Sequence, residues 1–422
     1  MRLALYLPPI IAAYALLAMA TPLSFDFIVN FVNPIGMQPN AILQTGLYAP
    51  WFFSIKYFYE FLLNVGLAPV QRPSDVIGFW YFQSTPRAYF LLLALKVPII
   101  IFTFASGIMI YLLDRRLGVS VNRASKAMLQ WLANPLVIIT TVMWGTWDVV
   151  ALFFTVVSLM LVYRGKTVLS AVSLLVAFAA KVIPIILLPV YLTYLYKTSR
   201  KGLLRFTAAF AGLFAVGGVG ALWLGGGTFA AGAGRVFGFY FPYFAGITLE
   251  AGLFQLSSTV VLLSLLVLLA ARFWRFQNKD ALIDLALVYL LVFFAMAFWH
   301  PQYLIYLMTF LAIRYGMTSR HRFTYLTIVL TAIGTSFIVF GFYFSSWGHS
   351  VLFIPNYTAI MQELSFFILM LPGDPIAHPV GVVLHSLFAA ACLYYAMMLF
   401  VPNASKNPRS TILTMEEGDR GR

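Results

Sequence analysis

The sequence predicts an all-α fold, that of a polytopic helical membrane protein. Of its 422 residues, 62% are hydrophobic and only 9% are charged, whereas soluble domains carry about 25% charged residues. The mean hydropathy is +0.91, and apolar runs recur from Leu3 to Phe400. Because a membrane-spanning helix needs about 20 apolar residues, this composition excludes a soluble globular protein and predicts many spans.

The positions of the basic residues define the expected topology. Lysine and arginine accumulate on the cytoplasmic side of a membrane, so the apolar runs between basic clusters predict about twelve spans (about ten to thirteen), with both termini cytoplasmic. The predicted spans are 3–22, 88–112, 127–143, 148–163, 167–180, 182–196, 203–224, 255–271, 281–299, 302–313, 323–344 and 379–400. The net charge of +14 is then a consequence of topology, and no nucleic-acid partner is expected.

The predicted domain organisation is one transmembrane domain over residues 1–401, followed by a disordered cytoplasmic tail over 402–422. The domain contains three long outer loops, at 24–87, 225–254 and 345–378. The protein should therefore recognise its ligands with loops and helix ends, since there is no room for a folded soluble domain of ordinary size.

Two features of the N-terminal region can be interpreted in more than one way. Aromatic residues around Trp51 and a Lys56/Glu60 pair one helical turn apart predict a helix lying on the membrane surface, which fits both lipid packing and substrate contact. The first apolar stretch imitates a secretory signal, but the Pro8-Pro9 pair favours an uncleaved first helix.

The stretch 167–196 is too long for one ordinary span. A helix of about 30 residues would run about 45 Å, well beyond the hydrocarbon core of about 30 Å. Basic clusters flank both of its ends, so it should fold back on itself with Lys181 at a tip submerged in the membrane.

Two further stretches, 127–163 and 281–313, repeat this geometry, and their tips hold Asp148 and His300. Non-helical backbone at membrane depth is tolerated only where protein buries it or water lines it. The three tips therefore predict an outward-facing cavity lined by Asp148, Lys181 and His300.

Several short motifs follow one another in a fixed order. They are Asn134-Pro135, Trp144-Gly145-x-x-Asp148, Arg164-Gly165-Lys166, Ala180-Lys181 with Pro184 and Pro189, and His300-Pro301-Gln302-Tyr303-Leu304. In these motifs the sequence resembles the GT-C superfamily of membrane glycosyltransferases, in particular its prokaryotic and GPI mannosyltransferase-like branch.

The resemblance implies ten or more helices and a catalytic aspartate in the first outer loop, a position that Asp26 occupies. It also implies an inverting transfer of a hexose, such as mannose, from a polyprenyl-phosphate carrier to the hydroxyl of a small or lipid-linked acceptor on the outer side of the membrane, with Asp26 as base. This chain departs from relatives that carry a paired acidic motif there, and Asp26 could instead be a solvated loop residue. We expect no cofactor and no bound metal, because the histidines lack metal-ligand spacing.

Each residue assigned to substrate binding has an alternative role. A cation within the membrane is by default a functional candidate, so Lys181 could bind the donor phosphate, or it could pair with Asp148 and stabilise the hairpins. Arg235 could hold phosphate or be solvated, while His300 and Gln302 could donate hydrogen bonds to sugar or phosphate.

The tryptophans of the second tip also admit two interpretations. Trp144 and Trp147 could stack on a sugar face or belong to an interfacial aromatic belt. The rival function for the whole chain is a secondary transporter or lipid flippase, because broken helices with charges at mid-membrane also build transport sites. Both interpretations place the chain in a membrane, either a prokaryotic plasma membrane or the endoplasmic reticulum.

Overall fold

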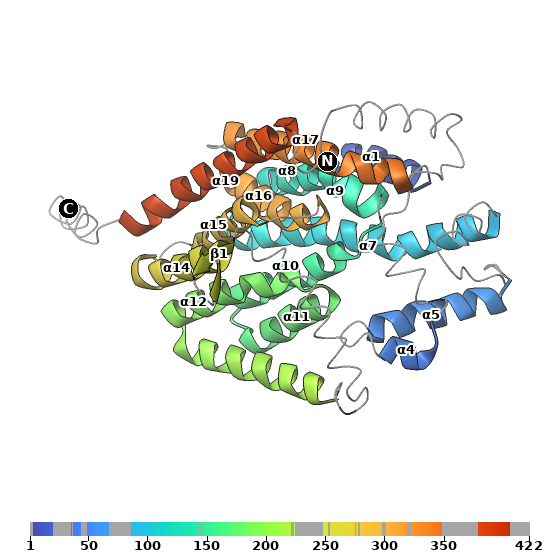
Figure 1. The fold of residues 1–422 in the computed structure, drawn as a ribbon, viewed down its shortest axis with the longest axis horizontal. Coiled ribbons are helices and arrows are strands. Elements are labelled where there is room, and N and C mark those ends of the chain that lie inside the picture. Colours follow the sequence, from blue (N-terminus) through green and yellow to red (C-terminus); the bar gives the residue numbers. More distant parts are fainter. Residues whose placement is uncertain are drawn as a thin grey trace, which may run out of the picture.

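The structure is a computed structural model in which helices form nearly every described element (Figure 1). The residues that it describes are 3–19, 35, 37–43, 49–66, 86–143, 145–220, 223, 248–251, 254–274, 276, 279–297, 301–318, 322–347 and 379–405. Of the predicted tail, residues 402–405 belong to the last described helix, and the part beyond Ser405 lies outside the described residues.

The elements follow the chain in this order. The first half contains α1 (Leu3–Met19), α4 (Pro39–Leu43), α5 (Ala49–Asn64), α7 (Pro86–Arg116), α8 (Val121–Leu132), α9 (Pro135–Val137), the π-helix η3 (Ile138–Met143), α10 (Asp148–Tyr163), α11 (Thr167–Ala180), the 3₁₀-helix η4 (Ile183–Leu187) and α12 (Leu188–Thr198). The second half contains the helix Arg200–Gly220, β1 (Thr248–Ala251), β2 (Phe254–Ser257), α14 (Ser258–Phe273), α15 (Ala281–Met296), the 3₁₀-helix η5 (Pro301–Tyr303), α16 (Leu304–Met317), α17 (Arg322–Trp347) and α19 (Pro379–Ser405).

Helices of two length classes make up the bundle. Among the described residues, the helices long and apolar enough to cross a bilayer are Lys96–Arg116, Arg200–Gly220 and Val382–Val401. Most of the other apolar helices are shorter; α10, for example, has 16 residues and rises about 24 Å. Such helices cannot cross the hydrocarbon core alone, which is why breaks such as η3, η4 and η5 matter to the architecture.

Local sequence explains two of the breaks between helices, the one between α8 and α9 and the one at η4. Asn134 caps α9, since its side-chain oxygen accepts a hydrogen bond of 2.9 Å from the Leu136 amide, and Pro135 occupies the first helical position, where proline costs no hydrogen bond. The predicted single span 182–196 is instead divided into η4 and α12, because Pro184 and Pro189 each start a new helical segment.

The core of the bundle is the hairpin of α15 and α16. Nearly every residue of both helices is buried, as expected for helices that are apolar on all faces. Helix α16 is joined to α8 by the Trp131 indole, which donates a hydrogen bond of 2.8 Å to Thr309 Oγ1. Helix α10 packs along α11, where Ser170 Oγ donates to the Ser158 carbonyl at 2.9 Å. In Figure 1, α15 and α16 lie between α19 and α10.

Two predicted outer segments contain described elements. Residues 49–64 form α5, as predicted, with Tyr59 buried, Tyr57 exposed and Lys56 Nζ 3.5 Å from Glu60 Oε1. The all-α prediction missed an antiparallel pair of short strands, β1 and β2, in which Leu249 lies opposite Leu256. The physical reason is that a Gly252-Leu253 dipeptide separates two stretches compatible with strand pairing.

Candidate functional site

Four of the predicted site residues can be placed. They are Trp147, Asp148, Lys181 and Gln302. The other four, Asp26, Trp144, Arg235 and His300, lie outside the described residues.

Asp148 is the first residue of α10 and its side chain is completely buried. The backbone before it folds back on the π-helix, because the Thr146 amide and hydroxyl both donate to the Thr140 carbonyl, at 3.0 and 2.9 Å. Gly145 makes this turn possible, since its φ of 65° falls in a region that L side chains rarely adopt. The positive end of the α10 dipole favours a carboxylate at this position.

Lys181 ends α11 in an extended conformation, with φ −157° and ψ 144°. Its amide still donates to the Ala177 carbonyl at 3.0 Å, so Lys181 caps the helix, whose last residue is Ala180. The Lys181 side chain is 5% exposed, and its Nζ lies 3.4 Å from Asp148 Oδ2. Of the two predicted roles of Lys181, pairing with Asp148 is therefore the one that the structure contains.

A third chain break completes the site. The Tyr303 ring lies 5.7 Å from Lys181 Nζ, in the geometry of a cation–π contact. The Tyr306 hydroxyl donates to the Asp148 carbonyl at 3.3 Å, and Gln302 is buried beside them in the same break. Described residues of all three predicted hairpins thus meet at one ion pair, while the outward-facing cavity stays a prediction.

The ion pair is costly to disturb by removal of one partner, although its burial adds little net stability. Its distance of 3.4 Å exceeds the 2.7–2.9 Å typical of charge-assisted hydrogen bonds. Burying two charges loses hydration that their attraction only partly returns, so removal of one partner alone leaves an uncompensated charge. The arrangement can therefore fix α10, α11 and α16 relative to one another.

Trp147 differs from both of its predicted roles. Its side chain is 7% exposed and its ring meets that of Phe102 edge to face, with centroids 6.3 Å apart. It packs inside the bundle and neither joins an interfacial belt nor offers a face for a sugar to stack on.

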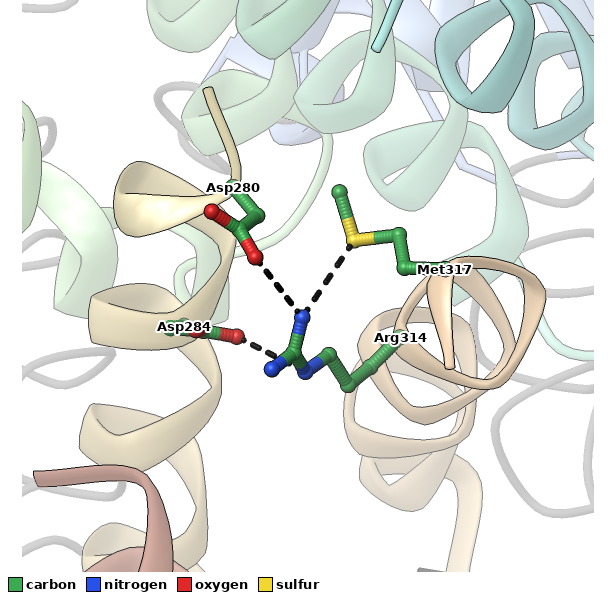
Figure 2. Close-up of polar contacts among 4 residues, drawn as sticks. All are labelled: Asp280, Asp284, Arg314 and Met317. Atoms are coloured by element: carbon green, nitrogen blue, oxygen red, sulfur yellow. Dashed lines mark hydrogen bonds and ion pairs between the residues drawn. The ribbon is translucent and has the colours of Figure 1, made fainter. Parts of the chain in front are cut away.

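Sequence reasoning missed a second polar cluster, at the opposite end of the α15–α16 hairpin (Figure 2). Arg314 Nη1 lies 3.0 Å from Asp280 Oδ2, and Arg314 Nε lies 3.0 Å from Asp284 Oδ1. Met317 Sδ is 3.9 Å from the same guanidinium. The sequence contained a signal for this cluster, because Asp280 and Asp284 are one helical turn apart. Arg314 was interpreted only as one of the basic residues that define the membrane topology.

Tyr303 and Tyr306 were also missed as site residues. Both follow Gln302 closely, and only the fold reveals that they face Lys181 and Asp148. In the part of the chain that is described, no three His, Cys, Asp or Glu side chains gather in a way that could hold a metal ion.

Residues 76–230 match the family model named PIG-U, which describes a GPI transamidase subunit. This segment is little more than a third of the chain and includes α8 to α12, the helix Arg200–Gly220 and both members of the ion pair. No curated protein matches the chain.

This similarity corrects the predicted function. The prediction of a glycosyltransferase that uses a polyprenyl-phosphate sugar is wrong, and so is the rival transporter or flippase, because the matching family is a GPI transamidase subunit. The role of Asp26 as a base depended on that reaction and is not retained. The coarser expectation holds: the sequence is similar to a membrane protein family of the GPI pathway, and the chain is a multi-pass integral membrane protein.

Proposed function

We propose that this chain is a membrane subunit of a transamidase that joins glycosylphosphatidylinositol (GPI) to proteins, and that it supplies the assembly with a membrane frame and not with a nucleophile. The observation that carries this proposal is the match of residues 76–230 to the PIG-U family. The matched segment contains the two tips that meet at Asp148 and Lys181. The similarity therefore covers α10 and α11, which carry the ion pair, while η5 and α16 lie outside the matched residues.

The chemistry of transamidation supports a non-catalytic role. The reaction exchanges one amide for another, and enzymes usually achieve this with an activated thiol or hydroxyl that forms an acyl intermediate. Cys392 is the only cysteine of the chain, and it is buried within α19. A thiol enclosed in a helix bundle cannot reach the carbonyl of a protein substrate.

The charged residues of the candidate site fit the same role. Asp148 and Lys181 are engaged with each other and with Tyr306 of α16 and Tyr303 of η5, respectively. Such contacts position helices, and this favours a frame on which another subunit presents the nucleophile.

The test is a depletion and rescue experiment in the organism that makes the protein. Membranes depleted of the chain should lose transfer of GPI to a reporter protein, and wild-type protein should restore it. Cys392→Ala should restore transfer equally well, since the thiol has no chemical role. Lys181→Met, expressed at the same level, should restore less.

Three results would contradict the proposal. Undiminished transfer after depletion would remove the chain from the reaction altogether. Loss of transfer with a folded Cys392→Ala protein would overturn the non-catalytic role. A tagged chain purified in mild detergent should also carry other membrane subunits with it, whereas recovery of the chain alone would argue against an assembly.

A further inference from the structure

Several exposed basic residues from distant parts of the sequence gather at the end of the bundle where α10 and α12 terminate. We call them the basic patch, and its members are Arg116, Arg164, Lys166, Lys197, Arg200 and Lys201, all of them exposed. They come from the end of α7, the turn between α10 and α11, and the turn between α12 and the helix Arg200–Gly220.

Contacts between their backbones and side chains hold these three segments together. Arg116 Nη2 donates to the Tyr163 carbonyl at 3.4 Å, which joins the end of α7 to the end of α10. Gly202 packs so closely on the start of α11 that a methyl group there would lie 3.2 Å from Thr167 Cγ2. Gly165, with φ 71°, forms the tight turn that separates Arg164 from Thr167. The fold, and not the sequence alone, therefore builds the patch.

Little negative charge balances this patch. The carboxylates that described elements bring to this end are Asp114, which is fully buried, and Asp280 and Asp284. The last two both pair with Arg314. The surface consequently presents a local excess of positive charge, which attracts polyanions and anionic membranes alike.

Exposed apolar side chains identify the kind of anion. Val168, Leu169 and Leu204, within a turn or two of the patch, are 45%, 52% and 72% exposed. Tyr196, which directly precedes Lys197, is 52% exposed, and tyrosine prefers the membrane–water interface. Cations above an apolar surface suit a lipid, with its phosphate at the cations and its acyl chains along the aliphatic residues; a soluble polyanion would leave that apolar surface unused.

A helix start contributes to the same place. The Gly202 amide donates to Ser199 Oγ at 3.0 Å, so Ser199 caps the helix Arg200–Gly220. The positive end of this helix dipole adds to the charge of Arg200 and Lys201. In Figure 1 this helix, yellow-green below α12, runs along the periphery of the bundle.

We propose that the basic patch binds the phosphate headgroup of an anionic phospholipid at the membrane interface. The lipid occupies an annular position against α11 and the helix Arg200–Gly220. This interaction is independent of the transamidase role and would exist in the isolated chain.

The test uses the purified full chain in uncharged detergent and short-chain lipid probes. Dioctanoyl phosphatidic acid should bind, as followed by native mass spectrometry or calorimetry, while dioctanoyl phosphatidylcholine should bind far more weakly. Free glycerol 3-phosphate provides the soluble-phosphate arm and should bind at least tenfold more weakly than the lipid. Equal binding of glycerol 3-phosphate would show a soluble phosphate site and overturn the lipid assignment.

Matched variants separate the basic patch from general positive charge. The triple variant Lys197→Gln/Arg200→Gln/Lys201→Gln should bind phosphatidic acid about a hundredfold more weakly, since each basic residue near an anionic lipid contributes about fivefold. The control Arg123→Gln/Lys126→Gln/Arg272→Gln removes the same charge from exposed residues that are not members of the basic patch and should bind as wild type does.

A charge-conserving variant guards against misfolding. Lys197→Arg/Arg200→Lys/Lys201→Arg should retain binding, which would exclude loss of structure as the cause in the glutamine triple. Equal weakening in the glutamine triple and its control would show that the chain attracts lipid by net charge, and the proposal would then be wrong. Binding of an acidic peptide in preference to phosphatidic acid would also overturn it.

Discussion

Replacement of Lys181 by methionine should destabilise the protein strongly. Its Nζ lies 3.4 Å from Asp148 Oδ2, and the Asp148 side chain has no exposed surface, so the variant leaves a buried carboxylate without its cation. Loss of one partner from such a pair costs about 3–5 kcal/mol. The α10 dipole stabilises the remaining charge by about 0.3–2 kcal/mol, which places the expected loss near the lower end, about 3 kcal/mol.

The double variant distinguishes an ion pair from simple packing. Asp148→Leu/Lys181→Met removes both charges, and a buried pair replaced by apolar residues is often neutral or even stabilising. We therefore expect the double variant to be more stable than Lys181→Met alone. The free energy of unfolding can be measured by titration from dodecyl maltoside into SDS, with ellipticity as the signal.

A surface variant calibrates this measurement. Lys126 is exposed on α8, so Lys126→Met should change stability by no more than about 0.5 kcal/mol. A loss below about 1 kcal/mol for Lys181→Met, or additive losses in the double variant, would refute a buried, coupled pair.

Three other substitutions test the packing of the bundle in the same assay. Gly316→Ala should cost about 1–3 kcal/mol, because the added methyl group would collide with the Asp114 carboxylate; Asp114→Ala should relieve this cost, and no relief would show that the contact is unimportant. Arg314→Met should cost about 3–5 kcal/mol, since it leaves the carboxylates of Figure 2 without their cation, and a cost equal to that of Arg314→Lys would contradict a charge effect. Ser170→Ala should cost about 0.6–1.7 kcal/mol because Ser158 and Ser170 are joined by reciprocal hydrogen bonds, and an unchanged unfolding curve would show that water replaces these bonds.

The sequence was most informative about where helices break. Basic clusters and helix length predicted the tip at Lys181, and α11 does end directly before that residue. The start of α10 at Asp148 was also predicted. Contacts across the chain were less accessible, because the bond from Tyr306 to Asp148 joins residues 158 positions apart. Only packing of α16 against α10 brings them together, and no local pattern encodes such a distance.

The functional prediction failed for a related reason. The motifs behind it are largely determinants of backbone geometry: Asn134 and Pro135 start a helix, while Gly145 and Gly165 adopt positive φ in turns. Residues of this kind specify an arrangement of broken helices that proteins of different activity can share. Asp26, the residue that was to carry the chemistry, lies outside the described residues and depended on its position alone.

The α15–α16 hairpin is fastened by charge near both of its ends, at Tyr303 beside Lys181 and at Arg314 beside Asp280. A slide of α16 by one turn, about 5.4 Å, would break its polar contacts at both ends together. We therefore expect α16 to keep its position along the bundle axis. We expect movement within the bundle to be confined to peripheral elements such as the helix Arg200–Gly220, in which only 11% of the span is buried.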